Sequence, residues 1–260
     1  MPTYLVTGAG RGLGYGFLRV LVSDPENTVC GLVRNKKAVQ DRLAADQITN
    51  VHLFEADITD EAALGRAAEE AKLVLGDRGL DVLINNAAYV SDVTALRTFK
   101  DLQSSFDTNV FGVLKTIFAF LPLVQKSSLK KIVVISSGMG DLDFVNATKL
   151  ANAAPYAISK AALNIMVAKL GAEYEEQGIL FISLCPGLVD TTEGRSITLP
   201  SDDLARQERI NARVSKYAPG FQASDPVSAA DNCLTAIERS TLKGGFGGSF
   251  LSHNGTKKWM

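Results

Sequence analysis

Tyr156 and Lys160 are the two residues whose types and spacing most directly indicate chemistry. They lie four residues apart in an Ala-, Leu- and Ile-rich stretch that begins after Pro155, which is typical of a helix with proline in its first turn. Side chains four apart on a helix share one face. A phenol has a reference pKa of about 10, which is too high for an acid or base at neutral pH. An ammonium group beside it stabilises the phenolate and so lowers the pKa of the tyrosine. A surface pair without function is the alternative interpretation.

The composition is that of a globular protein. The chain has 260 residues, of which 46% are hydrophobic, and a formal net charge of −1. This length and apolar content favour one large domain over two small ones. A near-neutral chain lacks the basic surface that nucleic acid or an anionic membrane requires, so a small-molecule ligand is favoured.

The cysteines and the apolar runs indicate the cellular location of the protein. Cys30, Cys185 and Cys233 are too few and too scattered for a disulfide framework or a metal cluster, so we predict buried free thiols and no metal site. Lys115 interrupts the longest apolar run before it reaches transmembrane length. The N-terminus enters a strand directly, which leaves no room for a signal peptide. We therefore expect a soluble cytoplasmic protein.

A glycine-rich loop follows the first predicted strand. The strand covers 3–7, the loop covers 8–14, and an apolar helical pattern continues from there. Glycines in this context let the backbone approach a pyrophosphate, whose charge is met by N–H groups and by the positive end of the helix. A plain tight turn is the alternative, and the flanking strand and helix make it the weaker one.

The second predicted strand, 28–33, ends without an acidic residue. An NAD-type Rossmann unit carries an acid near this position for the ribose 2′-hydroxyl. Here Arg34, Lys36 and Lys37 form a small basic group, which suits a 2′-phosphate. An ordinary solvated turn is the alternative.

The other strands indicate the fold. They are predicted at 51–56, 80–84, 131–137, 178–185 and 248–251. Their apolar character is typical of a parallel sheet that is buried on both faces. We predict a single-domain, Rossmann-type α/β fold over 1–260, with a doubly wound parallel sheet of about seven strands flanked by helices. Ligands bind at the carboxyl ends of such strands, where both Ser136 and Ser137 should point at the site. After the 51–56 strand, Asp60 is predicted to cap the next helix, which leaves Asp57 free for a ligand.

Three helical segments complete the pattern. A long helix is predicted over 99–124, and Asn109 within its apolar face should either kink the helix with a water or face solvent. Another helix follows Pro226, with Asp225 as its cap. The polar segment 191–221 has a central helical patch but no place in the sheet, so we predict a substrate lid there.

Taken together, these motifs resemble the short-chain dehydrogenases/reductases over essentially the whole chain. The enlarged segment 138–154 and the ending 248–259 are similar to the carbonyl-reductase branch that holds sniffer-like and fungal polyketide ketoreductases. Ala88 stands where the family usually has glycine. The resemblance implies a catalytic tetrad of Asn109, Ser137, Tyr156 and Lys160. It also implies cofactor contacts from Gly8, Arg11, Gly12, Leu13, Gly14, Arg34, Asp57, Ile58, Asn85, Asn86, Ala87, Tyr156, Lys160, Pro186, Gly187, Val189 and Thr191.

The resemblance further implies reduction of a ketone or aldehyde with NADP(H), on an apolar, aromatic or polyketide-like substrate. Tyr156 would be the general acid, Ser137 would hold the carbonyl oxygen, and Lys160 would lower the pKa of Tyr156. Asn109 would hold a water that connects Lys160 to solvent. Pairing through the 99–124 helix and the helix after Tyr156 would give a homodimer or homotetramer. Two alternatives stay open: an enzyme of this fold that reduces an imine or catalyses another reaction, and a non-catalytic dinucleotide-binding regulator.

Overall fold

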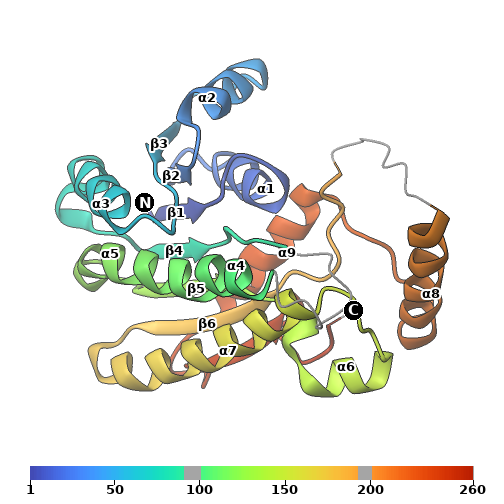
Figure 1. The fold of residues 1–260 in the computed structure, drawn as a ribbon. Helices are drawn as coiled ribbons and strands as arrows, with labels where there is room; N and C mark the ends of the chain where they lie inside the picture. Colours follow the sequence, from blue (N-terminus) through green and yellow to red (C-terminus); the bar gives the residue numbers. More distant parts are fainter. Residues whose placement is uncertain (91–100, 193–200, 260) are drawn as a thin grey trace.

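The centre of the structure is one parallel β-sheet. The computed structural model describes residues 1–90, 101–192 and 201–259. The strands are β1 Thr3–Thr7, β2 Thr28–Val33, β3 Val51–Glu55, β4 Val82–Asn85, β5 Lys131–Ile135, β6 Leu180–Cys185 and β7 Ser249–Ser252. They form a 7-stranded sheet in the order β3-β2-β1-β4-β5-β6-β7, and every pairing is parallel (Figure 1). The predicted fold class is therefore confirmed.

Helices cover both faces of the sheet (Figure 1). On one face lie α1 Gly12–Leu21, α2 Lys36–Ala45 and α9 Pro226–Arg239. On the other lie α3 Glu61–Leu75, α5 Val113–Lys126 and α7 Ala154–Tyr174. All residues of β1, β4, β5 and β6 are buried, because side chains on both sides of these strands meet a helix layer.

Further helices lie on the side where the strands end. They are α4 Leu102–Phe106, α6 Leu142–Thr148 and α8 Ser201–Tyr217, together with a short 3₁₀ turn at Gly138–Gly140. Two other 3₁₀ turns, Gly76–Arg78 and Glu175–Gln177, precede β4 and β6. The sequence did not predict α6, which lies in the enlarged segment 138–154. The helical patch predicted inside 191–221 is confirmed as α8. Residues 193–200 of that segment lie outside the described residues, and its role as a lid stays a prediction.

Side-chain caps and prolines begin the main helices where the sequence indicates. The Asp60 carboxylate accepts a hydrogen bond from the Ala63 amide at the start of α3. Asp225 likewise accepts from the amides of Val227 and Ser228, and Pro226 takes the first position of α9. Both predicted caps are confirmed.

The helix predicted over 99–124 is divided by a turn of π-helix. Between α4 and α5, residues Asp107–Gly112 form this wider turn, which places Asn109 inside the protein. By length and composition alone, the run Leu102–Lys126 is apolar enough to span a membrane, so the expectation that Lys115 rules this out was wrong. Core helices have the same composition, and 56% of the tested window is buried within the protein.

Close packing of α1 on α9 gives a stability prediction at Gly16. A methyl group on Gly16 would lie 2.2 Å from the Pro226 carbonyl oxygen, so Gly16→Ala forces these two helices apart. We expect a loss of about 1–3 kcal/mol in the free energy of unfolding, measured in urea. Gly65→Ala in α3 is the control. A methyl group there meets nothing within 4 Å, and the substitution should stabilise the protein by up to about 1 kcal/mol. Equal effects of both substitutions would contradict the packing argument.

Candidate active site

Lys160 and Tyr156 lie on one face of α7, directed at the end of β5. The Lys160 side chain is 2% exposed, and its Nζ donates a 2.7 Å hydrogen bond to the Ile135 carbonyl oxygen. The same Nζ lies 5.5 Å from the centre of the Tyr156 ring. A buried ammonium held against a phenol is not a surface pair, so that alternative is excluded.

Burial changes the proton affinity of both groups. It lowers the pKa of Lys160 to about 7, and the nearby Cys185 thiol opposes this shift only in part. Burial also raises the pKa of Tyr156, and Cys185 adds to this shift, while a hydrogen bond with the Ser137 side chain opposes it. In the chain by itself the tyrosine therefore stays protonated, which is the form a general acid needs. In the chain alone, burial outweighs the lowering of the Tyr156 pKa that the resemblance implies for Lys160, so the net shift is upward.

Ser137 is the partner of Tyr156 across the site. It follows β5 and caps the 3₁₀ turn, where its Oγ accepts a 3.2 Å hydrogen bond from the Met139 amide. Its contact with Tyr156 brings two hydroxyls to one point. The neighbouring Ser136 was predicted to point the same way, and that prediction was wrong. It is 2% exposed and donates a 2.7 Å hydrogen bond to the Asn164 side chain of α7, because adjacent residues of extended chain face opposite ways.

Asn109 is fully buried and joins three parts of the site. Its amide nitrogen donates to the Tyr89 carbonyl and to Ser159 Oγ, both at 2.9 Å. Its amide oxygen accepts from the Tyr89 backbone N–H at 2.8 Å. Of the two alternatives predicted for Asn109, solvent exposure is excluded, and the helix is distorted at this residue as a π-helical turn. The amide thus ties this helix to α7 and to the segment after β4.

The glycine-rich loop packs tightly against the segment after β4. Gly8 has a φ of +65°, and a methyl group on Gly14 would lie 2.2 Å from the Gly8 carbonyl oxygen. The Asn86 side chain donates a 2.9 Å hydrogen bond to the Thr7 carbonyl. Thr7 Oγ1 in turn accepts from the backbone amides of Asn86 and Ala87, each at 3.0 Å. The loop and the Asn-Asn-Ala segment therefore form one rigid unit at the start of α1.

This unit fits a dinucleotide phosphate. A side chain at Gly14 would collide with the Gly8 carbonyl, so the loop can keep its tight turn only with glycine there. Because α1 begins inside this loop, the positive end of the helix is available to a phosphate. Within the predicted set, Leu13 and Ile58 place their side chains in the two main cores. The Asn85 amide donates to the Val133 carbonyl of β5, so it holds the sheet together.

Charged groups surround the end of β2. Arg34 and Arg11 are both exposed. Burial of Asp57 opposes its ionisation, but two hydrogen bonds from Thr59 and the charge of Arg34 bring its pKa below the usual value. The predicted basic group is smaller than the sequence indicates, because Lys37 forms a 2.5 Å ion pair with Asp41 on α2.

The segment after β6 closes the site from the opposite side. A methyl group on Gly12 would lie 3.1 Å from Thr191 Cγ2, so Thr191 lies against the glycine loop. Gly187 has a φ of +78°, and Val189 forms a β-bridge with Ser224. The predicted phosphate and nicotinamide ends of the site are therefore next to each other.

Sequence reasoning missed an arginine that holds the glycine loop from outside. Arg42 of α2 donates a 3.2 Å hydrogen bond to the Gly10 carbonyl, and its guanidinium lies 3.9 Å from the centre of the Tyr15 ring. The Tyr15 hydroxyl donates to Asp46 at 2.5 Å. The spacing of Arg42 and Asp46 on one helix face was the available signal, but their partners on α1 are distant in sequence.

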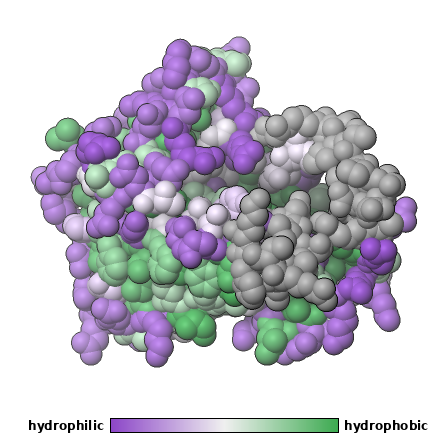
Figure 2. All heavy atoms as spheres, viewed as in Figure 1, coloured by the Kyte–Doolittle hydropathy of each residue, from purple (hydrophilic) through white to green (hydrophobic). Residues whose placement is uncertain are grey.

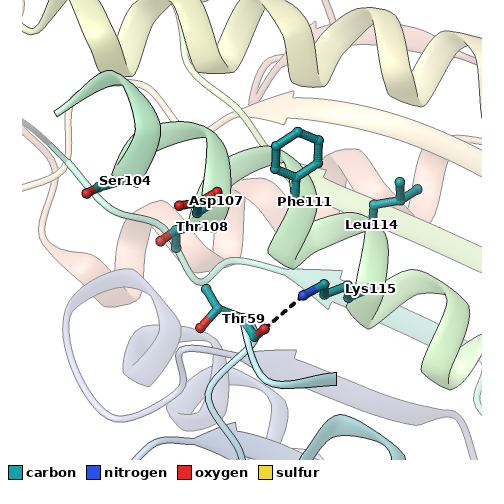
Figure 3. A pocket seen from close by; sticks show the side chains of 7 residues that line it. All are labelled: Thr59, Ser104, Asp107, Thr108, Phe111, Leu114 and Lys115. Atoms are coloured by element: carbon teal, nitrogen blue, oxygen red, sulfur yellow. Dashed lines mark hydrogen bonds between the residues drawn. The ribbon is translucent and has the colours of Figure 1, made fainter. Parts of the chain in front are cut away.

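A surface groove of about 610 Å³ lies outside this site (Figure 3). It is lined by Thr59, Ser104, Asp107, Thr108, Phe111, Leu114 and Lys115. Figure 3 shows that Lys115 reaches across it to the Thr59 carbonyl, a 3.0 Å hydrogen bond. Asn109, Ser137, Tyr156 and Lys160 do not line this groove, so it is separate from the candidate active site. Within the described residues, no cluster of His, Cys, Asp and Glu suits a metal ion.

The sheet order, the glycine loop and the Ser137, Tyr156 and Lys160 arrangement define a dinucleotide-binding α/β oxidoreductase. The chain belongs to the short chain dehydrogenase family, whose sequence model matches residues 2–200. Members of this family bind a nicotinamide dinucleotide, and the chain is an oxidoreductase of this class.

Particular relatives include fungal proteins and carbonyl reductases. The chain is 44% identical to the short-chain dehydrogenase/reductase AacuF of Aspergillus aculeatus and 37% identical to the short chain dehydrogenase virK of Hypocrea virens. Both alignments cover 100% of this chain and 100% of the relative. NADPH-bound carbonyl reductase from chicken fatty liver is a solved structure with 26% identity and a TM-score of 0.79. The Sniffer carbonyl reductase of D. melanogaster has 25% identity and a TM-score of 0.76. Coverage is 98% of both chains in each structural comparison.

The buried Lys160 gives a pH prediction for the free energy of unfolding. Its folded pKa of about 7 is below the unfolded value, so the unfolded chain binds more protons above pH 7. Stability from this residue should therefore rise from about pH 7 towards pH 10, by up to about 1.4 kcal/mol per pH unit. The buried thiols act in the opposite direction above about pH 8.5, so the measured quantity is the difference between wild type and Lys160→Met in urea. The exposed Lys169 of α7 is the control. A Lys169→Met variant should follow wild type, and no difference for Lys160→Met would contradict the shifted pKa.

Proposed function

We propose that this protein is an NADPH-dependent carbonyl reductase that converts a ketone or aldehyde to an alcohol. The observation that carries the proposal is the meeting of the Ser137 and Tyr156 hydroxyls above the buried Lys160 ammonium. This arrangement combines a protonated acid, a second donor at the same point and a buried cation. These three groups are what addition of hydride to a carbonyl requires.

The bound nicotinamide supplies the hydride that adds to the carbonyl carbon. Ser137 donates a hydrogen bond to the carbonyl oxygen, and Tyr156 gives its proton to that oxygen as negative charge develops there. Product formation leaves Tyr156 as a phenolate, which needs a proton before the next turnover. Lys160 is close enough to stabilise the phenolate and, with a pKa of about 7, can pass on a proton near neutral pH. Asn109 holds α7 in place for this step through Ser159.

The apolar surroundings of Ser137 support an apolar, aromatic or polyketide-like substrate. Phe144, Leu150, Cys185 and Trp259 form a small buried cluster beside the Ser137 loop, separate from the two main cores. The names of several fungal relatives agree with an oxidoreductase role but do not name a substrate. Imine reduction on the same fold is the second candidate, because the same acid and hydride geometry serves a C=N bond. A non-catalytic regulator would have no use for a buried Lys160.

The proposal also includes location and assembly. A cytoplasmic protein that binds neither nucleic acid nor membrane agrees with the net charge of −1. Self-association as a homodimer or homotetramer is supported by the apolar face over α5 and α7, where hydrophobic side chains gather (Figure 2). That face includes Phe111, Phe118, Ile158 and Ile165, which are 40–66% exposed.

Removal of the Tyr156 hydroxyl tests the general acid. In Tyr156→Phe the alkoxide has no positioned proton donor, so kcat should fall by about 10²- to 10⁴-fold, while NADPH affinity is largely retained. Turnover is followed by NADPH oxidation with a panel of aldehydes, quinones and aryl ketones. Tyr174→Phe, at the far end of the same helix, is the matched loss of a hydroxyl and should behave as wild type. A Tyr156→Phe variant with near-normal turnover would remove this residue from the mechanism.

Cofactor preference tests the end of β2. A 2′-phosphate can be met by the exposed Arg34 and Arg11, and we expect kcat/KM to favour NADPH over NADH by about 10²-fold at low salt. Arg34→Ala and Arg11→Ala should reduce this preference, whereas Glu55→Gln should increase it. The Glu55 carboxylate is 2.7 Å from the Lys36 amide next to Arg34, where it repels a phosphate. Lys37→Ala is the control, because Lys37 pairs with Asp41. Equal use of both cofactors by wild type would contradict the assignment.

Substitution on the apolar face tests self-association. Phe118→Asp and Ile165→Asp each place a charge among apolar side chains that a partner would bury, so each should convert the oligomer to monomer in light scattering at micromolar concentration. Leu73→Asp is the control, because Leu73 is 86% exposed on α3 and is not one of the four side chains that define this face. A monomeric wild type would refute the proposed assembly.

A further inference from the structure

Trp259, close to the C-terminus, is buried beside the loop that carries Ser137. Its side chain is 3% exposed, and its ring stacks on Phe250 of β7 with centroids 4.2 Å apart and an interplanar angle of 21°. It belongs to the small cluster with Phe144, Leu150 and Cys185. Most of a tryptophan surface is therefore removed from water at the edge of the active site.

The residue after Ser137 is held between this tryptophan and the end of β6. The Gly138 amide donates a 3.2 Å hydrogen bond to Cys185 Sγ. On the other side, a methyl group on Gly138 would lie 2.8 Å from Trp259 Cβ and 2.9 Å from its Cγ. No side chain fits between the loop and the tryptophan, so the position of one fixes the position of the other.

The segment that delivers Trp259 also contacts the opposite wall of the site. After β7, the His253 amide donates a 2.8 Å hydrogen bond to the Cys185 carbonyl, and the His253 ring lies 3.0 Å from where a methyl group on Gly187 would be. The chain then turns back, with a 2.7 Å hydrogen bond from the Ser252 amide to the Thr256 carbonyl. The C-terminal segment therefore runs from the segment after β6 to the Ser137 loop.

We propose that Trp259 is a positioning residue for Ser137: it holds Gly138 against Cys185 so that the Ser137 hydroxyl meets the Tyr156 hydroxyl where a carbonyl oxygen binds. The inference rests on the proposed reductase function for its kinetic consequence and on packing alone for its structural one. Because the cluster around Trp259 is separate from the two sheet cores, loss of the ring acts first on this loop. Small displacements matter here, since a donor misplaced by about 1 Å can cost about 10²-fold in rate.

The experiment compares Trp259→Ala and Trp259→Phe in wild type and in Ser137→Ala. In Trp259→Ala, kcat should fall by about 10- to 10²-fold with a smaller change in KM. The kinetic pKa of Tyr156 should also rise, because the Ser137 hydrogen bond that opposes its upward shift is weakened. Trp259→Phe keeps an aromatic ring against Phe250 and should restore most of the rate. In the Ser137→Ala background, Trp259→Ala should cause little further loss, because both substitutions remove the same contact.

A structural readout works without activity. Hydrogen exchange of the 138–141 amides should be faster in Trp259→Ala and near normal in Trp259→Phe, at a temperature where thermal unfolding shows all variants folded. Phe246→Ala is the control. It also removes an aromatic ring, but this ring packs against the core under α1 and α9, so the 138–141 amides should stay protected. Unchanged exchange at 138–141 in Trp259→Ala would overturn the inference, as would rate losses that multiply with Ser137→Ala. If wild type reduces no carbonyl or imine, the proposed function fails, while the exchange result still decides the role of Trp259.

Discussion

The structure of the site depends on one buried contact, the hydrogen bond from Lys160 to the Ile135 carbonyl. An ammonium that is 2% exposed loses almost all of its hydration, and this cost is tolerable only where a carbonyl oxygen replaces the water. The contact therefore fixes α7 against the end of β5. Because Ser137 follows that same strand and Tyr156 lies on that same helix, this hydrogen bond sets the separation of the two elements that carry the hydroxyls. The site is precise because its acid and its donor are positioned by rigid elements.

A second constraint comes from Asn109, a polar side chain in an otherwise apolar helix face. A regular helix would leave its amide either in solvent or buried without partners. The π-helical turn resolves this conflict, because the extra residue lets the amide reach the backbone N–H and C=O of Tyr89 and the hydroxyl of Ser159. The local irregularity thus joins the segment after β4 to α7, and the same segment is bonded to the glycine loop through Thr7. The two halves of the site are therefore connected by hydrogen bonds in which the side chains of Thr7 and Asn109 bind backbone groups.

The parts that the sequence predicted are those set by local patterns. Short apolar runs bounded by glycine or proline gave seven strands within about two residues, and Asp60 and Asp225 marked helix starts because a cap acts within one turn. The misses depended on contacts between distant residues. The direction of Ser136 required knowing that β5 ends at Ile135, and the burial of Asn109 required a partner in a segment without periodicity. Arg42 and Trp259 reach the site by packing across the fold, and their partners are distant in sequence, so the spacing of Arg42 and Asp46 did not reveal what they contact.

The opposite pKa shifts of Tyr156 and Lys160 share one cause and serve one purpose. Burial destabilises the charged form of both groups, so it favours a protonated phenol and a lysine that exchanges its proton near neutral pH. In water the same pair would hold an ammonium that rarely gives up a proton at neutral pH. Negative charge develops on Tyr156 during proton transfer, and the centre of its ring lies 5.5 Å from Lys160 Nζ in a region of low polarity, where the attraction is much stronger than in water. The burial that disfavours the resting charges therefore stabilises the pair of charges that the reaction creates.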